Sequence, residues 1–316
     1  MRPFFIYSCK FDILRNSDTT GYFGPDTITW RLYREPWFVF GGVRALILQV
    51  AHPAVADGVA HYSRFQSDPF GRAYRTFEAM ASIYFGDRAM ADATAFRLHH
   101  LHAGIKGRFP EAGANTDERE YSANDPDLLL WVLSTLTDTT LKLYDLLQLK
   151  GLPANWQEQF YEESKITARL FGIPGHIYPR DLTAFRQYFD DVLNGPLLGS
   201  TLPCRDMAQA IIRHPRAPSR LATLLAAGLL PQTLCERLDI ASQPDAAMRL
   251  EKWLRRARAF YRITPSKLRY NPAYWQAKKR IAREKQANAP VLGLFYDWLG
   301  RFVKIPLGLP TPPPAP

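Results

Sequence analysis

The chain has 316 residues, of which 47% are hydrophobic and 22% charged, and its formal net charge is +10. This composition is typical of a soluble globular protein with one large domain or two. Three cysteines, odd in number and far apart, exclude a disulfide framework and a CxxC metal site, so we expect a reducing, cytoplasmic environment. The apolar run LATLLAAGLL reaches about half of the roughly 20 residues that span a bilayer, which excludes a clear transmembrane helix.

The N-terminal part of the chain carries little periodic pattern. Residues 1–27 look irregular, and Asp26 or Thr27 is placed to cap a short helix, TITWRLYRE, which Pro36 ends. The next helix begins at the Gly41–Gly42 pair, where the missing side chains let it pack closely against a neighbour. Its apolar residues continue through VRALILQVA.

Prolines and glycines mark the next helix ends. Proline disfavours helical geometry at the preceding residue, so His52–Pro53 predicts a helix break, where free backbone groups can make a site polar. Asp68–Pro69 predicts a helix start with an acidic cap and proline in the first turn. That helix ends at Gly86, and a further helix runs from Asp87 to a C-terminal cap at Gly107.

The second half of the chain is helical in pattern throughout. The longest pattern, over 125–150, is apolar on most faces and is therefore expected at the centre of the fold. Without an alternating run long enough for a sheet, we predict an all-α fold, a single domain of about ten helices. The expected parts are an irregular segment 1–27, a helical domain 28–287 and a C-terminal amphipathic segment with a Pro-rich tail, 288–316. Further helices are expected over 155–171, 180–194, 205–213, 217–227, 231–239, 244–262 and 272–287.

Positive charge is concentrated in one stretch. Between Arg249 and Lys285 there are thirteen Lys or Arg against Glu251 and Glu284, an excess of eleven, so the remaining chain is close to neutral. One interpretation is a solvated helix face with its aromatic residues packed inward. The other is a working surface for anionic lipid or nucleic acid.

Histidine is the main candidate for a ligand. Five of the seven histidines lie among apolar, helix-patterned residues: His52, His61, His99, His100 and His102. The sequence has no GxGxxG after a strand, no P-loop, no GxSxG, no HExxH and no ExxH motif of a di-iron bundle. A single helix-borne imidazole that faces an apolar cavity is a common haem ligand. Such a histidine is also often a core residue satisfied by one hydrogen bond.

Three stretches together resemble a known family. They are GGVRALILQVAHPAVADGVAHYSRFQSDPFGRAYRTF, then HAGIKG, then YSANDPDLLLWV. The pattern, over roughly 28–275, is similar to the DUF2236 family, the catalytic domain shared by the ER-bound oxygenase MpaB and the rubber oxygenase called latex clearing protein. The resemblance implies an all-helical fold around a haem b pocket. It also implies O2 chemistry, typically oxidative cleavage of a C=C bond in an isoprenoid chain.

The resemblance assigns roles to individual residues. The family's Arg-xxx-Thr element, important for haem retention, corresponds to Arg72 and Thr76. The pattern His-x-x-aliphatic-x-Gly picks out His102 as the proximal haem ligand and thus the metal ligand. Where rubber oxygenase has a lysine that approaches the distal side of the iron, this chain has Arg75. A guanidinium is a poor iron ligand, so an open or water-bound distal site is implied.

These roles define the expected site. Arg72, Arg75, Thr76 and His52 are the candidate catalytic residues, and Arg72 or Arg75 is expected to pair with a haem propionate. His52 has an alternative role in helix-break and capping hydrogen bonds. The pocket that receives O2 is expected to be kept dry by Phe77, Met80 and Trp131, because exclusion of water favours addition of O2 to an apolar alkene.

The implied function is a haem b-dependent oxygenase that acts with O2 on a hydrophobic or lipid-like substrate. A protein of this kind is expected in the cytoplasm, with peripheral contact to an anionic membrane and without nucleic acid. Two alternatives remain at this point. One is a non-haem or cofactor-free helical protein that uses His99 and His102 with His52. The other is a non-enzymatic helical protein whose basic 249–285 segment is its working surface.

Overall fold

The fold is all-α, as predicted. The computed structural model describes residues 19–35, 38–63, 69–110, 118–147, 151–213, 219–241, 245–265 and 269–284, without the side chains of 38, 39, 69–74 and 219. The irregular segment 1–27 and the tail 288–316 of the predicted domain division therefore lie largely or wholly outside the described residues. Within the described residues there are thirteen helices, more than the ten or so expected: α1 (Ile28–Tyr33), α2 (Phe38–Ala51), α3 (Pro53–Tyr62), α4 (Pro69–Phe85), α5 (Arg88–Ala103), α6 (Pro126–Leu147), α7 (Ala154–Leu170), α8 (Leu182–Asn194), α9 (Leu202–Ile212), α10 (Ser219–Leu229), α11 (Gln232–Arg237), α12 (Ala246–Ile263) and α14 (Pro272–Glu284).

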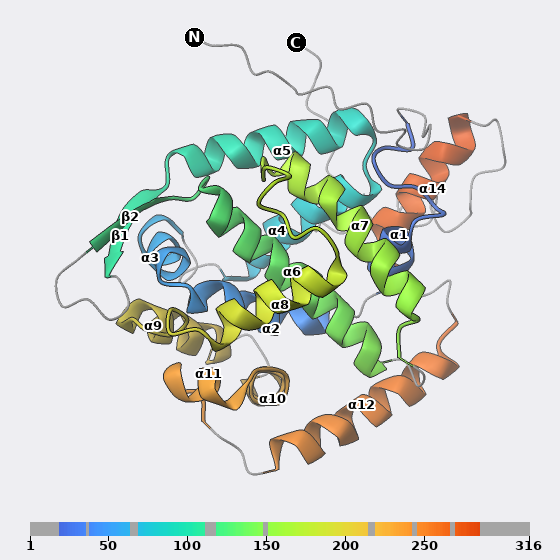
Figure 1. Cartoon of the computed structure of the whole chain (residues 1–316). Coiled ribbons are helices and arrows are strands. Elements are labelled where there is room, and N and C mark those ends of the chain that lie inside the picture. The colour runs from blue at the N-terminus through green and yellow to red at the C-terminus, as the bar shows by residue number, and fades with distance from the viewer. Residues whose placement is uncertain are drawn as a thin grey trace, which may run out of the picture.

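The centre of the fold is α6, which the sequence predicted. This helix runs through the middle of the molecule with α2, α7 and α8 around it (Figure 1). Trp131 of α6 is 1% exposed, stacks on Phe189 of α8 and donates its indole N–H to the carbonyl of Leu48 in α2, 3.1 Å away. The aromatic pair and the satisfied indole fix how three helices meet.

α2 approaches α6 closely at its N-terminal end. A Cβ atom at Gly41 would lie 2.4 Å from Leu143 Cδ1 and 2.6 Å from Thr139 Cγ2, so any other residue would force these two side chains to move. One of the two expected glycines therefore has the predicted packing role, whereas Gly42 faces open space.

A buried arginine fastens the same helices together. Arg44 of α2 is 2% exposed, and its Nη2 lies 2.6 Å from Asp138 Oδ2 of α6. Its Nη1 donates to Thr139 Oγ1 at 2.6 Å, and its Nε donates to the carbonyl of Leu229 in α10 at 3.0 Å. The guanidinium is bonded on three sides, so its contacts fix how α2, α6 and α10 meet, and loss of the arginine would leave its partners without their donor.

Several helix ends follow the capping rules applied to the sequence. Thr27 Oγ1 accepts from the N–H of Trp30 at 3.3 Å, and Asp87 Oδ1 accepts from the N–H of Met90 at 2.8 Å. α4 begins at Pro69 and ends before Gly86, as predicted. These ends were predictable because each depends on contacts within a few residues.

The prediction for the end of α5 was wrong. The helix ends at Ala103 with Gly104 as its cap, and the chain continues as a hairpin of β1 (Lys106–Pro110) and antiparallel β2 (Glu118–Ser122). Each strand buries one large side chain, Phe109 or Tyr121, so the sequence shows little alternation. The expectation of no sheet was wrong for the same reason.

Packing against α3 stabilises the hairpin. Tyr121 Oη donates to Asp57 Oδ2 of α3 at 2.7 Å, and Tyr62 Oη donates to the carbonyl of Lys106 at 2.8 Å. Gly107 allows this approach, since a Cβ atom there would lie 2.7 Å from Asp57 Oδ2 and 2.8 Å from the Tyr121 hydroxyl. Gly107 therefore serves a close tertiary contact rather than a helix end.

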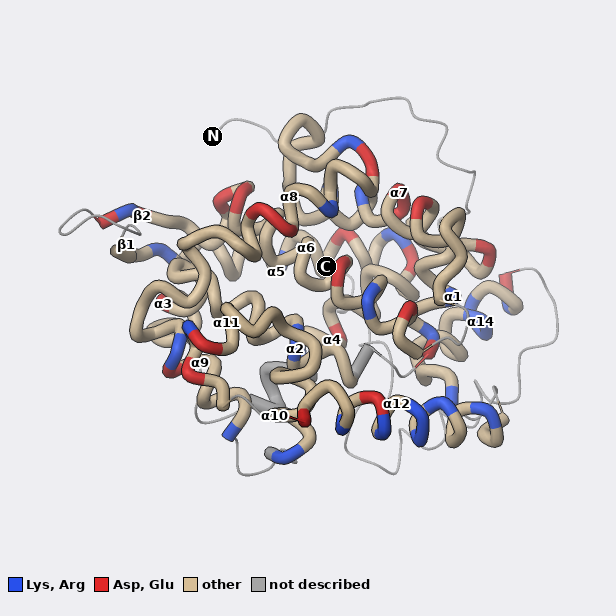
Figure 2. Tube along the Cα trace, turned by 60° about the horizontal axis from the view of Figure 1, so that its bottom comes forward, with Lys and Arg blue, Asp and Glu red and all other residues tan. Residues whose placement is uncertain are grey.

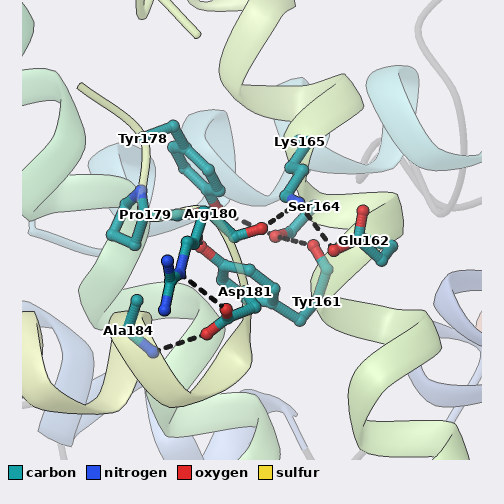
Figure 3. A network of polar contacts seen from close by, with 9 residues as sticks. All are labelled: Tyr161, Glu162, Ser164, Lys165, Tyr178, Pro179, Arg180, Asp181 and Ala184. Atoms are coloured by element: carbon teal, nitrogen blue, oxygen red, sulfur yellow. Dashed lines mark hydrogen bonds and ion pairs between the residues drawn. The ribbon is translucent and has the colours of Figure 1, made fainter. Parts of the chain in front are cut away.

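The segment between α7 and α8 is held by a polar network (Figure 3). Ser164 Oγ lies 2.8 Å from the Tyr178 hydroxyl, and Lys165 Nζ donates to the carbonyl of Arg180 at 2.7 Å. Asp181 begins α8, where its Oδ1 accepts a backbone N–H at 2.8 Å. Burial raises the pKa of Tyr178 to about 12, so its hydroxyl stays protonated. The network is structural, and it contains none of the predicted site residues.

α14 contacts the turn between α4 and α5. Arg280 Nη2 donates to the carbonyl of Phe85 at 2.6 Å, and its Nε donates to the carbonyl of Thr19 at 2.8 Å. The guanidinium thus satisfies a carbonyl at the C-terminal end of α4. None of the helices within the described residues is long and apolar enough to cross a membrane.

Candidate functional site

The α4–α5 hairpin carries most of the predicted site residues. The two helices are joined only by Gly86 and Asp87 and pack against each other. In Figure 1, α5 lies along the edge of the molecule and α4 runs deeper inside it. The two helices run in opposite directions on either side of a short turn. The first half of α4 and the second half of α5 therefore lie at the same end of the hairpin, the end away from the turn. This arrangement brings the Arg72–Thr76 turn to the end of the hairpin that carries His102.

The inner face of α5 ends in His102. Ala91 and Ala95 are 0% and 8% exposed, and Leu98 and His102 follow on the same face at spacings of three and four residues. Leu98 and His102 are half-buried. The small residues allow close packing on α4 near the turn, and the larger ones follow farther from it. This stripe of small then large residues is a signal that the sequence reading did not use.

The two neighbouring histidines face solvent. His99 and His100 are both exposed. The His100 ring stacks on Phe96, with 5.9 Å between centroids, and Phe96 is itself 70% exposed. Of the three histidines of α5, His102 alone lies on the inner face.

Across the hairpin, α4 changes from apolar to polar along its length. Phe77 and Met80 are half-buried and pack against the aromatic cluster that contains Phe23, Trp30 and Phe85. Arg75 and Thr76, which directly precede Phe77, are exposed. Arg72 lies on the helix four residues before Thr76, so the helical backbone places both on one face, although the side chain of Arg72 is outside the described residues.

Trp131 lies elsewhere in the fold. It belongs to the main core with Phe189 and Leu48, whereas Phe77 and Met80 pack against the separate aromatic cluster. The structure therefore does not group Trp131 with Phe77 and Met80, and the dry pocket itself stays a prediction. How α6 packs relative to α4 is not contained in the sequence pattern.

His52 caps α3. The predicted helix break is present, and His52 Nδ1 accepts from the N–H of Ala54 at 3.2 Å. The ring is 8% exposed and meets Phe109 of β1 edge-on, with 5.9 Å between centroids. The carbonyl of Ala51 at the break accepts from the N–H of Gly199 at 2.8 Å. The break is thus filled by structural hydrogen bonds.

The two ends of α3 contact different residues of β1. His52 begins this helix beside Phe109, whereas Tyr62 ends it and bonds to Lys106, four residues after His102. Ten helical residues correspond to about 15 Å. His52 therefore lies at the end of α3 that is farther from Lys106, the residue four positions after His102.

The capping role of His52 predicts a pH dependence. Burial, followed by the charge of Arg119, lowers the pKa of His52 from 6.5 to about 4. Between these values the unfolded chain binds a proton that the folded protein does not, so the free energy of unfolding should fall as the pH drops through this window. His52→Asn keeps a capping oxygen but does not titrate in this range. Between pH 7 and pH 4.5 the variant should lose less of its free energy of unfolding than the wild type, by on the order of 2 kcal/mol, as measured by urea unfolding.

The matched control for this experiment is His61→Asn. His61 lies at the other end of α3 with a side chain that is 68% exposed, and its Nδ1 lies 3.0 Å from Asp57 Oδ1. The two variants therefore compare a buried and an exposed histidine of the same helix. An unchanged pH profile in His52→Asn would contradict the assigned protonation state.

The donors of this site fit a single axial imidazole. Among the described residues, no group of three or more His, Cys, Asp or Glu could hold a metal ion. A non-haem iron site requires such a group, typically two histidines and a carboxylate, whereas haem b requires one imidazole from the protein. The half-buried His102 on the inner face of α5, the cation of Arg75 and the apolar side chains of Phe77 and Met80 on α4 are residue types that suit haem b and its propionates.

Comparison with known proteins places the chain in a family. No curated protein and no solved structure matches it. The model of the family described as "ER-bound oxygenase mpaB/B'/Rubber oxygenase, catalytic domain" matches residues 30–263. This range contains the α4–α5 hairpin and about three quarters of the 316 residues. The chain therefore belongs to the family of the MpaB and rubber oxygenase catalytic domains and carries an oxygenase domain.

Proposed function

We propose that the protein is a haem b-dependent oxygenase, with His102 as the axial ligand and an apolar, alkene-containing molecule of the isoprenoid class as substrate. The observation that supports it best is the position of His102. It continues the inner face of α5, while His99 and His100 are exposed. A haem held without a covalent link needs one such imidazole in an apolar setting.

Each neighbouring side chain has a role consistent with this function. His102 would hold the haem iron through Nε2, and its place in the last turn of α5, just before the cap residue Gly104, would fix its orientation on the hairpin. Phe77 and Met80 supply the apolar wall that excludes water. The exposed cation of Arg75 suits a propionate at the rim better than the iron, and Arg72 and Thr76 support cofactor retention from the same helix end. When bound, haem supplies the redox centre at which O2 is activated.

The non-haem alternative has less support. It required His99, His102 and His52 at one metal ion, yet His99 is exposed and His52 is engaged as the cap of α3. A binuclear or facial-triad site needs its donors within a few ångströms of one point. The positions of these three histidines favour one ligand rather than three.

A spectrum tests the cofactor. The purified protein, as isolated or after addition of haemin, should show an intense Soret band, which non-haem iron does not produce. Titration with haemin should saturate at one equivalent. A protein that stays without a Soret band after reconstitution would contradict the proposal.

A matched pair of hydrocarbons tests the substrate class. The haem-loaded protein should consume O2 with squalene and not with squalane, the saturated molecule of the same skeleton. The C=C bond is the only relevant difference between the two. Equal O2 consumption with both hydrocarbons, or no consumption with either, would contradict an alkene-directed oxygenase.

A further inference from the structure

α12 has one face that belongs to the core. Leu250 and Leu254 are 6% and 2% exposed and pack in the main core. Arg258 turns back toward α6, where its Nη2 donates to the carbonyl of Leu146 at 2.6 Å and its Nη1 pairs with Glu251 at 3.0 Å. These contacts fix how the helix is rotated, and therefore which residues it turns outward.

The outward face combines positive charge with large apolar side chains. Lys252, Arg255, Arg256 and Arg262 are exposed. On the same side, Met248 is 69% exposed, Phe260 66% and Ile263 78%, which makes three of the seven large hydrophobic residues that are exposed within the described part of the chain. Figure 2 shows the Lys and Arg residues along α12 at the lower edge of the molecule.

The spacing aligns part of this outward face in one stripe. Met248, Lys252, Arg256, Ala259 and Ile263 follow each other at intervals of three or four residues, the interval at which helical side chains are neighbours. Apolar residues thus stand at both ends of the stripe and cations between them. Exposed aliphatic and aromatic groups of this size are costly in water unless a partner covers them.

The other half of the basic segment does not contribute to this surface. In α14, Lys279 is 7% exposed and Arg280 donates to the carbonyls of Phe85 and Thr19. Of the aromatic residues expected beside the charges, Trp275 is buried and Trp253 packs edge-on against Phe40. In α14, Lys279 and Arg280 thus serve packing and bonding within the fold, and Trp253 and Trp275 pack inward, whereas the outer face of α12 combines exposed cations with exposed apolar side chains.

We propose that the outer face of α12 docks on an anionic lipid bilayer, with the helix parallel to the membrane plane. Its cations meet lipid phosphates and carboxylates, and Met248, Phe260 and Ile263 enter the boundary between headgroups and acyl chains. Nucleic acid offers phosphates but no apolar layer for these three side chains. A lipid surface therefore complements both the cations and the apolar side chains of the outer face. The surface is independent of the haem site, since none of its residues lies on α4 or α5.

Co-sedimentation with vesicles tests the proposal. At about 50 mM salt the protein should bind vesicles of phosphatidylcholine with 30% phosphatidylserine, and binding to pure phosphatidylcholine should be much weaker. Each basic residue near an anionic surface strengthens binding roughly fivefold, so Arg255→Gln/Arg256→Gln should weaken it about thirtyfold. Phe260→Ser/Ile263→Ser should weaken it too, and the loss should persist at high salt, where the charges are screened.

The control removes the same charge from another part of the surface. Arg180, just before α8, and Arg186, within α8, are both exposed. Arg180→Gln/Arg186→Gln should therefore change vesicle binding less than about threefold. Equal losses in the two double variants would overturn the proposal, because the net charge rather than α12 would then govern binding. Binding to a DNA duplex at the same salt without binding to the vesicles would also overturn it.

Discussion

His102→Ala should give a folded protein that no longer retains haem and has no Soret band above that of free haemin. The axial imidazole both orients a non-covalently bound haem and contributes much of its affinity. His102 lies on the inner face of α5 at its last turn, half-buried, so its truncation to alanine disturbs little packing. Haem content from the ratio of Soret to protein absorbance, with the far-ultraviolet circular dichroism spectrum as a folding check, measures the effect.

The adjacent histidines provide the controls for this experiment. His99→Ala and His100→Ala should bind haem normally, because both side chains are exposed on the other sides of the helix. Arg75→Ala and Thr76→Ala should lose haem faster than wild type without abolishing the band, since each removes a supporting contact and leaves the iron ligand. Normal haem content in His102→Ala with loss in His99→Ala would mean that a different histidine is the ligand.

Arg44→Leu should lower the free energy of unfolding by about 3–5 kcal/mol, the cost of removing one partner of a buried ion pair. The substitution leaves the Asp138 carboxylate, the Thr139 hydroxyl and the Leu229 carbonyl without the donor that they share. Urea unfolding followed by circular dichroism, with the midpoint and slope both fitted, measures the loss.

Two further variants isolate the cause. Arg108→Leu removes an exposed pair with Glu120, whose side chains are 63% and 74% exposed, and should leave the free energy of unfolding nearly unchanged. Arg44→Leu/Asp138→Leu should recover part of the stability that the single change loses, because no buried charge is left alone. If Arg44→Leu were as stable as Arg108→Leu, the junction of α2, α6 and α10 would not depend on Arg44.

The helical framework was predictable because its signals are local. Thr27, Asp87 and Pro69 set helix starts through contacts within one turn, and the apolar periodicity of 125–150 placed α6 at the centre. The hairpin was missed because its stability comes from α3. Asp57, distant in sequence, binds Tyr121 and lies against Gly107. A five-residue strand with one buried residue has no periodic pattern that would predict it.

The candidate site was only partly accessible from sequence. The resemblance singled out His102 among three neighbouring histidines, and spacing alone put Arg72 and Thr76 on one face. Whether Trp131 or His52 shares their pocket depends on how α6 and α3 pack, which periodicity does not give. The oxygenase family is shown by the match over residues 30–263, whereas the haem and its ligand remain predictions.

The contacts of Arg280 have a consequence for the order in which the chain folds. They join α14 to the end of α4 across 195 residues and to the segment before α1 across 261. During synthesis from the N-terminus, α4 and α5 leave the ribosome long before the guanidinium that satisfies the Phe85 carbonyl. Contacts so distant in sequence form slowly, because a long loop must close first. We therefore expect the α4–α5 turn to reach its final geometry late, and a nascent chain that stops before 272 to acquire haem less efficiently than the full chain.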